Sequence, residues 1–153
     1  MLRTLTMVAG FAVFIALSPS SFAQQSQFGS ATEAKEMLER AITELKSNEG
    51  AAIEKFHNGA PGFRDRDLYV LCFNIRDGKI VAHIVQAMMG MDVKALKDAN
   101  GKAFGQELFD AAKENLIIEV AYMFPRPGSN EPAQKVAYVT KVGNIGCGVG
   151  HYK

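Results

Sequence analysis

The chain lacks a charge excess of either sign. Lys and Arg together number 17 and Asp and Glu number 16, so the formal net charge is +1 at pH 7. Proteins that bind nucleic acid or a membrane surface carry basic patches, and a near-neutral composition does not favour them. We therefore expect no nucleic-acid partner and no long-range field that steers a highly charged ligand.

The common motifs of catalysis and metal binding are also missing. The sequence has no glycine-rich phosphate loop, no His-Glu-x-x-His and no nucleophile elbow. His57, His83 and His151 are too scattered to indicate a metal site. The methionines of 88–91 could suit Cu(I), but a flexible apolar loop or core filler is the simpler interpretation. We expect no catalytic residue, no metal and no cofactor, so the protein is not expected to be an enzyme.

Long apolar runs are scarce, and the one that stands out is too short to span a membrane. It is Met7–Leu17, which follows Arg3 and precedes a small-x-small cleavage pattern at 21–23. A bilayer core needs about 20 consecutive apolar residues. We therefore interpret residues 1–23 as a cleaved signal peptide. The mature protein is then expected to begin near Gln24, to be periplasmic or secreted, and to carry no anchor.

Cysteine is scarce as well, because Cys72 and Cys147 are the only two. They form no Cys-x-x-Cys or Cys-x-x-Cys-His motif, which argues against thioredoxin-like chemistry and covalent haem attachment. In an exported protein a lone pair most often forms one disulfide. Two free buried thiols are the alternative.

The first element behind the signal is predicted to be helical. Residues 24–29 form a polar, flexible lead, and Ser30 with Glu33 makes a capping-box pattern. Apolar residues then recur at helical spacing: Met37, Leu38, Ala41, Ile42, Leu45, Ala52, Ile53 and Phe56. This predicts one long amphipathic helix over 32–57, or two collinear pieces with Gly50 as the weak point.

The remainder of the chain, residues 67–153, predicts a small sheet. Apolar β-type runs indicate five strands, at 68–75, 80–84, 116–124, 136–142 and 145–152. Asp77-Gly78 marks a hairpin between the first two strands. Short helices are expected at 93–97 and 104–113. The order predicts an α+β fold with a five-stranded antiparallel sheet, helices on its faces, and one domain over 30–153.

The last strand has one face almost without side chains. Gly146, Gly148 and Gly150 alternate there with residues that carry side chains. Glycines in this pattern usually mark a close approach by another element. We expect the long helix to pack on the bare face. The alternative is that this face forms the floor of a ligand cavity.

Several segments, taken in order, resemble the single Cache domain family, a PAS-like class of extracytoplasmic sensor domain. They are Asp67–Val70, Asp77–Lys79 with Ala82-His83, Leu96–Phe104, Tyr122–Pro125, Lys135–Val139 and Gly148–Lys153. The resemblance implies a PAS-like sheet, a long N-terminal helix and a pocket for a small ligand, in many members an organic acid or an amino acid. The chain departs from the family pattern after His83, where Ile84–Ala87 replaces a common proline-and-asparagine turn.

The resemblance also implies which residues form the ligand site. A small carboxylate needs one or two donors and an apolar wall. His83 and Lys135 are the expected donors, and Tyr69, Tyr122 and Tyr138 are expected to line the pocket. For each of them a structural role in the core or at its rim is the alternative.

Two further expectations depend on position in the fold. In a PAS-like strand order the first and last strands are neighbours, so a cross-strand disulfide between Cys72 and Cys147 is geometrically allowed. Arg126 lies between two prolines in a loop. It could clamp a ligand, but exposure to water is the simpler interpretation.

One functional hypothesis and one alternative follow. The first is a periplasmic sensor domain for a small organic acid or amino acid, which signals through a separate partner such as a membrane sensor protein. The alternative is an interaction module whose N-terminal helix makes a homodimer or docks on a membrane sensor without a ligand. An exposed apolar stripe on that helix would favour the alternative.

Overall fold

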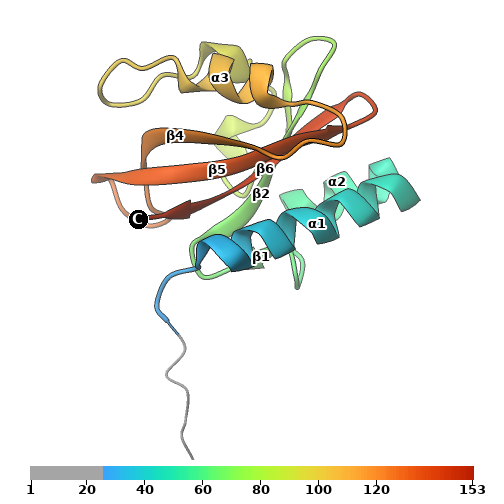
Figure 1. The fold of residues 1–153 in the computed structure, drawn as a ribbon, viewed down its shortest axis with the longest axis horizontal. Coiled ribbons are helices and arrows are strands. Elements are labelled where there is room, and N and C mark those ends of the chain that lie inside the picture. The colour runs from blue at the N-terminus through green and yellow to red at the C-terminus, as the bar shows by residue number, and fades with distance from the viewer. Residues whose placement is uncertain (1–25) are drawn as a thin grey trace, which may run out of the picture.

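The computed structural model of the protein describes residues 26–153. The expected signal peptide and its cleavage site lie outside these residues. Within them, none of the helices has the length and apolar character needed to cross a bilayer. The domain is an antiparallel sheet with a helical layer on each face (Figure 1).

Two helices, not one, form the first layer. Helix α1 is Ala31–Ser47 and begins with the predicted capping box, in which Ser30 and Glu33 bond each other's backbone amides. Helix α2 is Glu49–His57. Asn48, between them, leaves the helical conformation, and its side chain accepts a hydrogen bond from Ala51 N.

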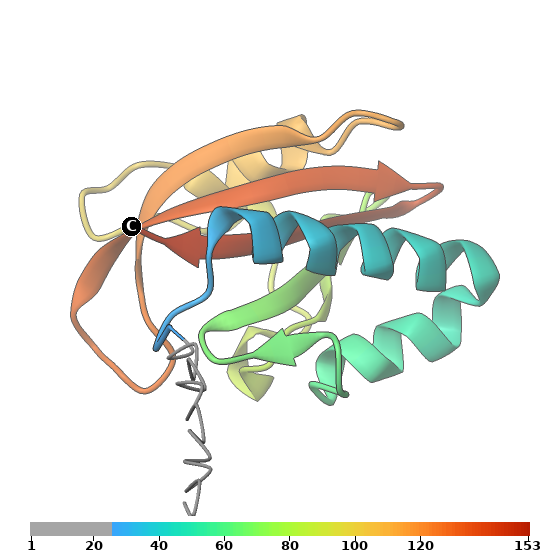
Figure 2. The same cartoon turned by 60° about the horizontal axis from the view of Figure 1, so that its bottom comes forward.

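The expectation of a single or collinear helix over 32–57 is wrong. Figure 2 shows that α2 turns back beneath α1. The break falls at Asn48, whose backbone N–H donates to Glu44 O at the end of α1 and whose side-chain oxygen caps α2. The weak point named from the sequence, Gly50, lies inside α2.

The lead before α1 is held against the domain rather than free. Arg66 donates from Nη1 to Ser26 O and Phe28 O, at 3.1 and 2.9 Å. Gly29 N donates to Asp67 Oδ1 at 2.7 Å. The expected flexible segment 24–29 is therefore bonded to the loop before the first long strand, in the part of it that the structure describes.

The sheet has the predicted antiparallel strands and one short addition. Its members are β1 (Arg64–Asp65), β2 (Leu68–Asn74), β3 (Ile80–Ala82), β4 (Ile118–Pro125), β5 (Pro132–Val142) and β6 (Ile145–Tyr152). The order is β1-β2-β6-β5-β4, with β3 paired to β2. The first and last long strands, β2 and β6, are therefore neighbours, as expected.

A second, smaller layer covers the other face of the sheet (Figure 1). It contains helix α3 (Phe104–Ala111) and two single 3₁₀ turns, η1 (Gln86–Met88) and η2 (Val93–Ala95). Two buried clusters correspond to the two layers. One joins α1 and α2 to the sheet, and the other joins α3 and η2 to the sheet.

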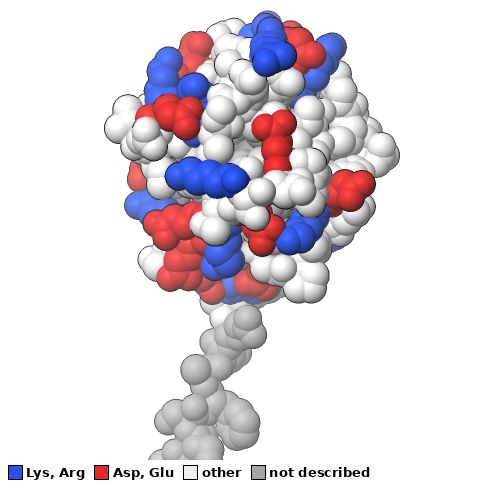
Figure 3. Space-filling view, turned by 90° about the vertical axis from the view of Figure 1, so that its right-hand side faces the viewer, with Lys and Arg blue, Asp and Glu red and all other residues white. Residues whose placement is uncertain are grey.

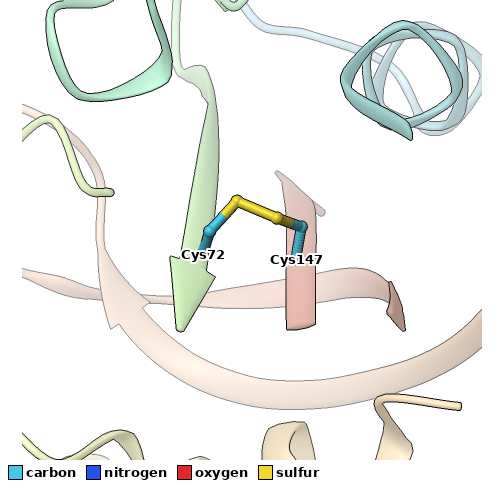
Figure 4. The surroundings of a disulfide bond; sticks show 2 residues. All are labelled: Cys72 and Cys147. Atoms are coloured by element: carbon cyan, nitrogen blue, oxygen red, sulfur yellow. A yellow bond between two sulfur atoms is a disulfide. The ribbon is translucent and has the colours of Figure 1, made fainter. Parts of the chain in front are cut away.

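The two cysteines form the predicted disulfide. Cys72 on β2 and Cys147 on β6 are direct partners in the strand pairing, and they are bonded (Figure 4). Both side chains belong to the buried cluster under α1. The two cysteines are 75 residues apart in the sequence, so the bond joins the first long strand of the chain to the last one.

Removal of this disulfide should destabilise the domain without changing its fold. Because the bond restricts the unfolded chain, replacing both Cys72 and Cys147 by Ala should lower the free energy of unfolding by about 2–4 kcal/mol. Urea denaturation followed by circular dichroism measures the change. The wild-type protein under reducing conditions is the control and should match the variant; a loss of less than about 0.5 kcal/mol would contradict the expectation.

Candidate ligand-binding site

A cavity lies between the sheet and the α3 layer. Its volume, measured to the centre of a water-sized sphere, is about 20 Å³, which is room for about one water molecule. The sheet contributes Tyr69, Leu71, Phe73, Tyr122, Phe124, Lys135, Ala137, Val139, Gly148 and Gly150. The opposite wall consists of His83, Met88, Leu96, Phe104 and Leu108. The wall is therefore mainly apolar, with one ammonium group, one imidazole and two phenols.

The glycines of β6 form the floor of this cavity. Gly148 and Gly150 line it, while α1 packs against the other face of β6, where Cys147 and Val149 lie. The expectation that the long helix covers the glycine face is therefore wrong, and Gly148 and Gly150 face a cavity instead. A Cβ atom on Gly150 would lie within 3.0 Å of Lys135 Cε, so the glycine leaves room for the lysine side chain.

Lys135 is the buried cation of the site. It is 2% exposed, and its Nζ donates a hydrogen bond to Tyr69 Oη at 2.9 Å. Nζ also lies 4.1, 4.8 and 5.5 Å from the ring centroids of Tyr69, Tyr152 and Phe124. Within residues 26–153, no carboxylate forms an ion pair with it. The ammonium group is thus held by aromatic faces and one hydroxyl.

Burial shifts the pKa of each ionisable group in the cavity toward its neutral form. Loss of hydration lowers the pKa of Lys135 to about 7, and the charge of Asp67 opposes this shift. Burial, and next the charge of Lys135, lower the pKa of His83 to about 4. Burial raises the pKa of Tyr69 and of Tyr122 above the ordinary tyrosine value. Both phenols are therefore protonated at neutral pH and can donate.

His83 has a defined orientation at the edge of the cavity. It is 2% exposed, and its Nδ1 accepts a hydrogen bond from Val85 N at 2.9 Å. Its ring lies edge-on to Tyr69, with centroids 5.0 Å apart. Because Nδ1 is an acceptor, the neutral ring carries its proton on Nε2 and can donate from there.

Four of the five residues named from the sequence line the cavity together. These are Tyr69, His83, Tyr122 and Lys135. Tyr138 does not: it lies in the buried cluster on the α1 face, with its ring stacked on His151 and 4.5 Å from Lys35 Nζ. Side chains alternate along β5, so residue 138 points away from the face that residue 135 occupies. Because one residue number is odd and the other even, alternation along the strand is enough to place Lys135 and Tyr138 on opposite faces of the sheet.

Two aromatic residues were not named from the sequence. Phe124 lines the cavity, and Tyr152 contacts Lys135 from the neighbouring position on β6. Tyr152 also donates from its hydroxyl to Pro125 O at 2.6 Å. The sequence already placed Tyr152 on the same side of β6 as the glycines, and that side faces the cavity, so its role could have been predicted.

The methionine segment and the histidines occupy separate places in the structure. Met88 lines the cavity, and Met91 is exposed. In the part of the chain that the structure describes, no three His, Cys, Asp or Glu side chains gather as metal ligands would. His57 instead lies with Nδ1 2.9 Å from His83 O.

Replacing Lys135 by Met should stabilise the domain, because it removes a charge that is buried without an ion-pair partner. We expect a gain of about 1–4 kcal/mol at pH 6. The gain should shrink as the pH rises from about 7 toward 10, since the native lysine loses its proton before the unfolded one does, and wild-type stability then increases. Urea denaturation at several pH values measures both effects. A variant less stable than wild type at pH 6 would show that the lysine stabilises the fold.

Three solved structures, two of chemotaxis proteins and one of a chemosensory domain, have a similar fold. A methyl-accepting chemotaxis protein from Vibrio parahaemolyticus superposes with a TM-score of 0.64 and 24% identity, covering 79% of this chain and 86% of that one. The periplasmic sensor domain of a chemotaxis protein gives 0.57 and 23%, covering 76% and 85%. A Cache chemosensory domain solved for its recognition of carboxylic acids gives 0.58 and 21%, covering 76% and 83%. At these identities the likeness concerns the fold.

The family itself is established by sequence. The family model for Single Cache domain 2 matches residues 20–152, which include nearly all of the described domain. This agrees with the ordered segments noted in the sequence and with the PAS-like sheet between two helical layers. The protein belongs to the single Cache domain family of extracytoplasmic sensor domains.

Proposed function

We propose that this protein is a periplasmic sensor for a small monocarboxylic acid and that it passes its ligand state to a separate partner, such as a membrane sensor protein. The observation that carries the proposal is Lys135, a buried ammonium group beside a cavity with one hydrogen-bond acceptor, Tyr69 Oη. An ammonium group has three donors, and leaving donors and charge unpaired inside a protein is costly.

A carboxylate supplies what the lysine lacks. Its two oxygens accept hydrogen bonds, and its charge balances the ammonium charge in a dry setting, where charge-assisted bonds are strongest. His83 and Tyr122 line the same cavity and can donate to the second oxygen. The similar fold of a Cache domain that recognises carboxylic acids supports this choice of ligand.

The lining favours an organic acid over an amino acid. Among the described residues that line the cavity there is no Asp or Glu, so the ammonium group of an amino acid would have no anionic partner. The rest of the wall is apolar, with Leu71, Phe73 and Leu108 close to the floor. A short aliphatic tail fits such a wall better than a second charged group.

Binding requires the cavity to expand. Its present volume of about 20 Å³ holds about one water molecule, which is smaller than acetate. Met88, in turn η1, is the wall residue from the methionine segment. In this proposal η1 moves outward as the ligand binds, and the new position of this segment is the change that a partner reads.

No observation favours the interaction module without a ligand. The apolar side of α1 packs on the sheet, and no large exposed hydrophobic residue belongs to α1 or α2. A shallow hollow on α1 is lined mainly by Glu36, Glu39, Arg40 and Glu44. Figure 3 shows charges of both signs interspersed on the face it presents, with no single-sign field.

Titration with small acids tests the proposal. Acetate, propionate or pyruvate should raise the melting temperature, with a stabilisation of about 2.7 kcal/mol at 100 times the dissociation constant. Glycine, alanine and succinate should have much smaller effects. Affinity should fall by up to tenfold per pH unit above about pH 7, because the lysine then loses the proton that the carboxylate needs.

Matched lysine variants are the controls for this titration. Lys135→Met should abolish the effect of the acids. Lys141→Met changes a lysine on the same strand that is paired with Glu114 at 3.2 Å, and it should bind as wild type does. The proposal fails if no monocarboxylate stabilises the wild-type protein, or if Lys135→Met binds as well as Lys141→Met.

A further inference from the structure

A second hollow lies directly outside the closed cavity. It has a volume of about 280 Å³ and opens to solvent between segment 84–85 and segment 124–130. Tyr69 and Phe124 line both the outer hollow and the inner cavity. These two aromatic side chains therefore form the partition between solvent and the lysine site.

Among the described residues that line the outer hollow, Arg126 is the one with a charge. Its guanidinium makes a single hydrogen bond within the described chain, from Nη2 to Lys153 O at 3.2 Å, and its buried Nε has no partner. Its Cζ lies 4.9 Å from the ring centroid of Tyr152, the ring that Lys135 Nζ approaches to 4.8 Å. Two cations, one outside the partition and one inside, thus share one aromatic ring.

The partition is less well covered on its Phe124 side than the opposite wall of the cavity is. Val85 is 48% exposed, although it closes one side of the outer hollow. Phe124 is half-buried, and it contacts Phe104 and Tyr122 edge-on, with no polar atom to hold it. By contrast, Phe104 and Leu108 on the opposite wall of the cavity are 2% and 1% exposed. The less buried wall of the cavity, which contains Phe124, is therefore the wall on the side of Arg126.

We propose that the outer hollow is the access route of the ligand, and that Arg126 is an outer anion-binding residue that receives the carboxylate before it passes between Tyr69 and Phe124 to Lys135. This rests on the function proposed above. The physical reason is local: the chain has nearly no net charge, so the cation of Arg126 beside the hollow provides the attraction that a long-range field does not. Arginine suits the task, because its planar fork binds a carboxylate through two bonds.

If this is the access route, substitutions along it should change the rate constants of ligand binding and leave the fold intact. Arg126→Gln should lower the association rate constant of acetate by about threefold to tenfold, reduce its dependence on salt, and leave the dissociation rate constant unchanged. Arg126→Lys should restore most of the rate. Phe124→Ala should raise both rate constants, because it thins the partition. Line-shape analysis of the NMR signal of ¹³C-acetate measures both constants, and circular dichroism verifies folding.

Arg76→Gln is the charge-matched control, since Arg76 is exposed in the turn between β2 and β3, away from the hollow. If Arg126→Gln and Phe124→Ala have the rate constants of Arg76→Gln while wild type binds acetate through Lys135, the access route is overturned and the proposed function stands. If wild type binds none of acetate, propionate and pyruvate, both are overturned.

Discussion

The burial of one ammonium group, that of Lys135, is the constraint on which the site depends. The charge loses its hydration, so its surroundings must compensate with aromatic faces and the hydroxyl of Tyr69. The long side chain also needs space, and Gly150 on the next strand leaves that space. The expected cost of burying this lysine is understandable if it serves a ligand, since functional groups are often kept at a cost in stability.

The alternation of side chains along the strands places the buried lysine on one face of the sheet and the main stabilising contacts on the other. One face of β5 and β6 carries the lysine, the glycines and the cavity. The other face carries the buried cluster under α1 and the Cys72–Cys147 disulfide. The disulfide joins neighbouring strands at the centre of the sheet, so it holds the floor of the cavity, while the proposed expansion involves the wall around η1 and Phe124. This arrangement allows a rigid scaffold and an adaptable site in a small domain.

Much of the fold could be predicted from local patterns, and the failures have specific causes. The strands, the hairpin and the capping box followed from periodicity and turn residues, which act over short distances. The helix break at Asn48 was missed because an asparagine is tolerated inside a helix as well as at its cap, and only the packing of α2 beneath α1 decides between these roles. The helix was placed on the wrong face of β6 because glycines indicate close approach, not which element approaches.

The sequence by itself determined where the strands lie in the chain and which types of side chain are available to a site, since these depend on local spacing and composition. The resemblance to the single Cache domain family implied that the first and last strands are neighbours, which allowed the Cys72–Cys147 bond that the structure shows. Four of the five residues named from it meet at one cavity, and parity along β5 could have excluded Tyr138. Only the tertiary structure decided that Lys135 is buried without an ion pair, that Tyr152 supports it, and that Arg126 lies just outside the aromatic partition. Burial and distance arise when strands far apart in the chain are brought together, and no local pattern encodes them.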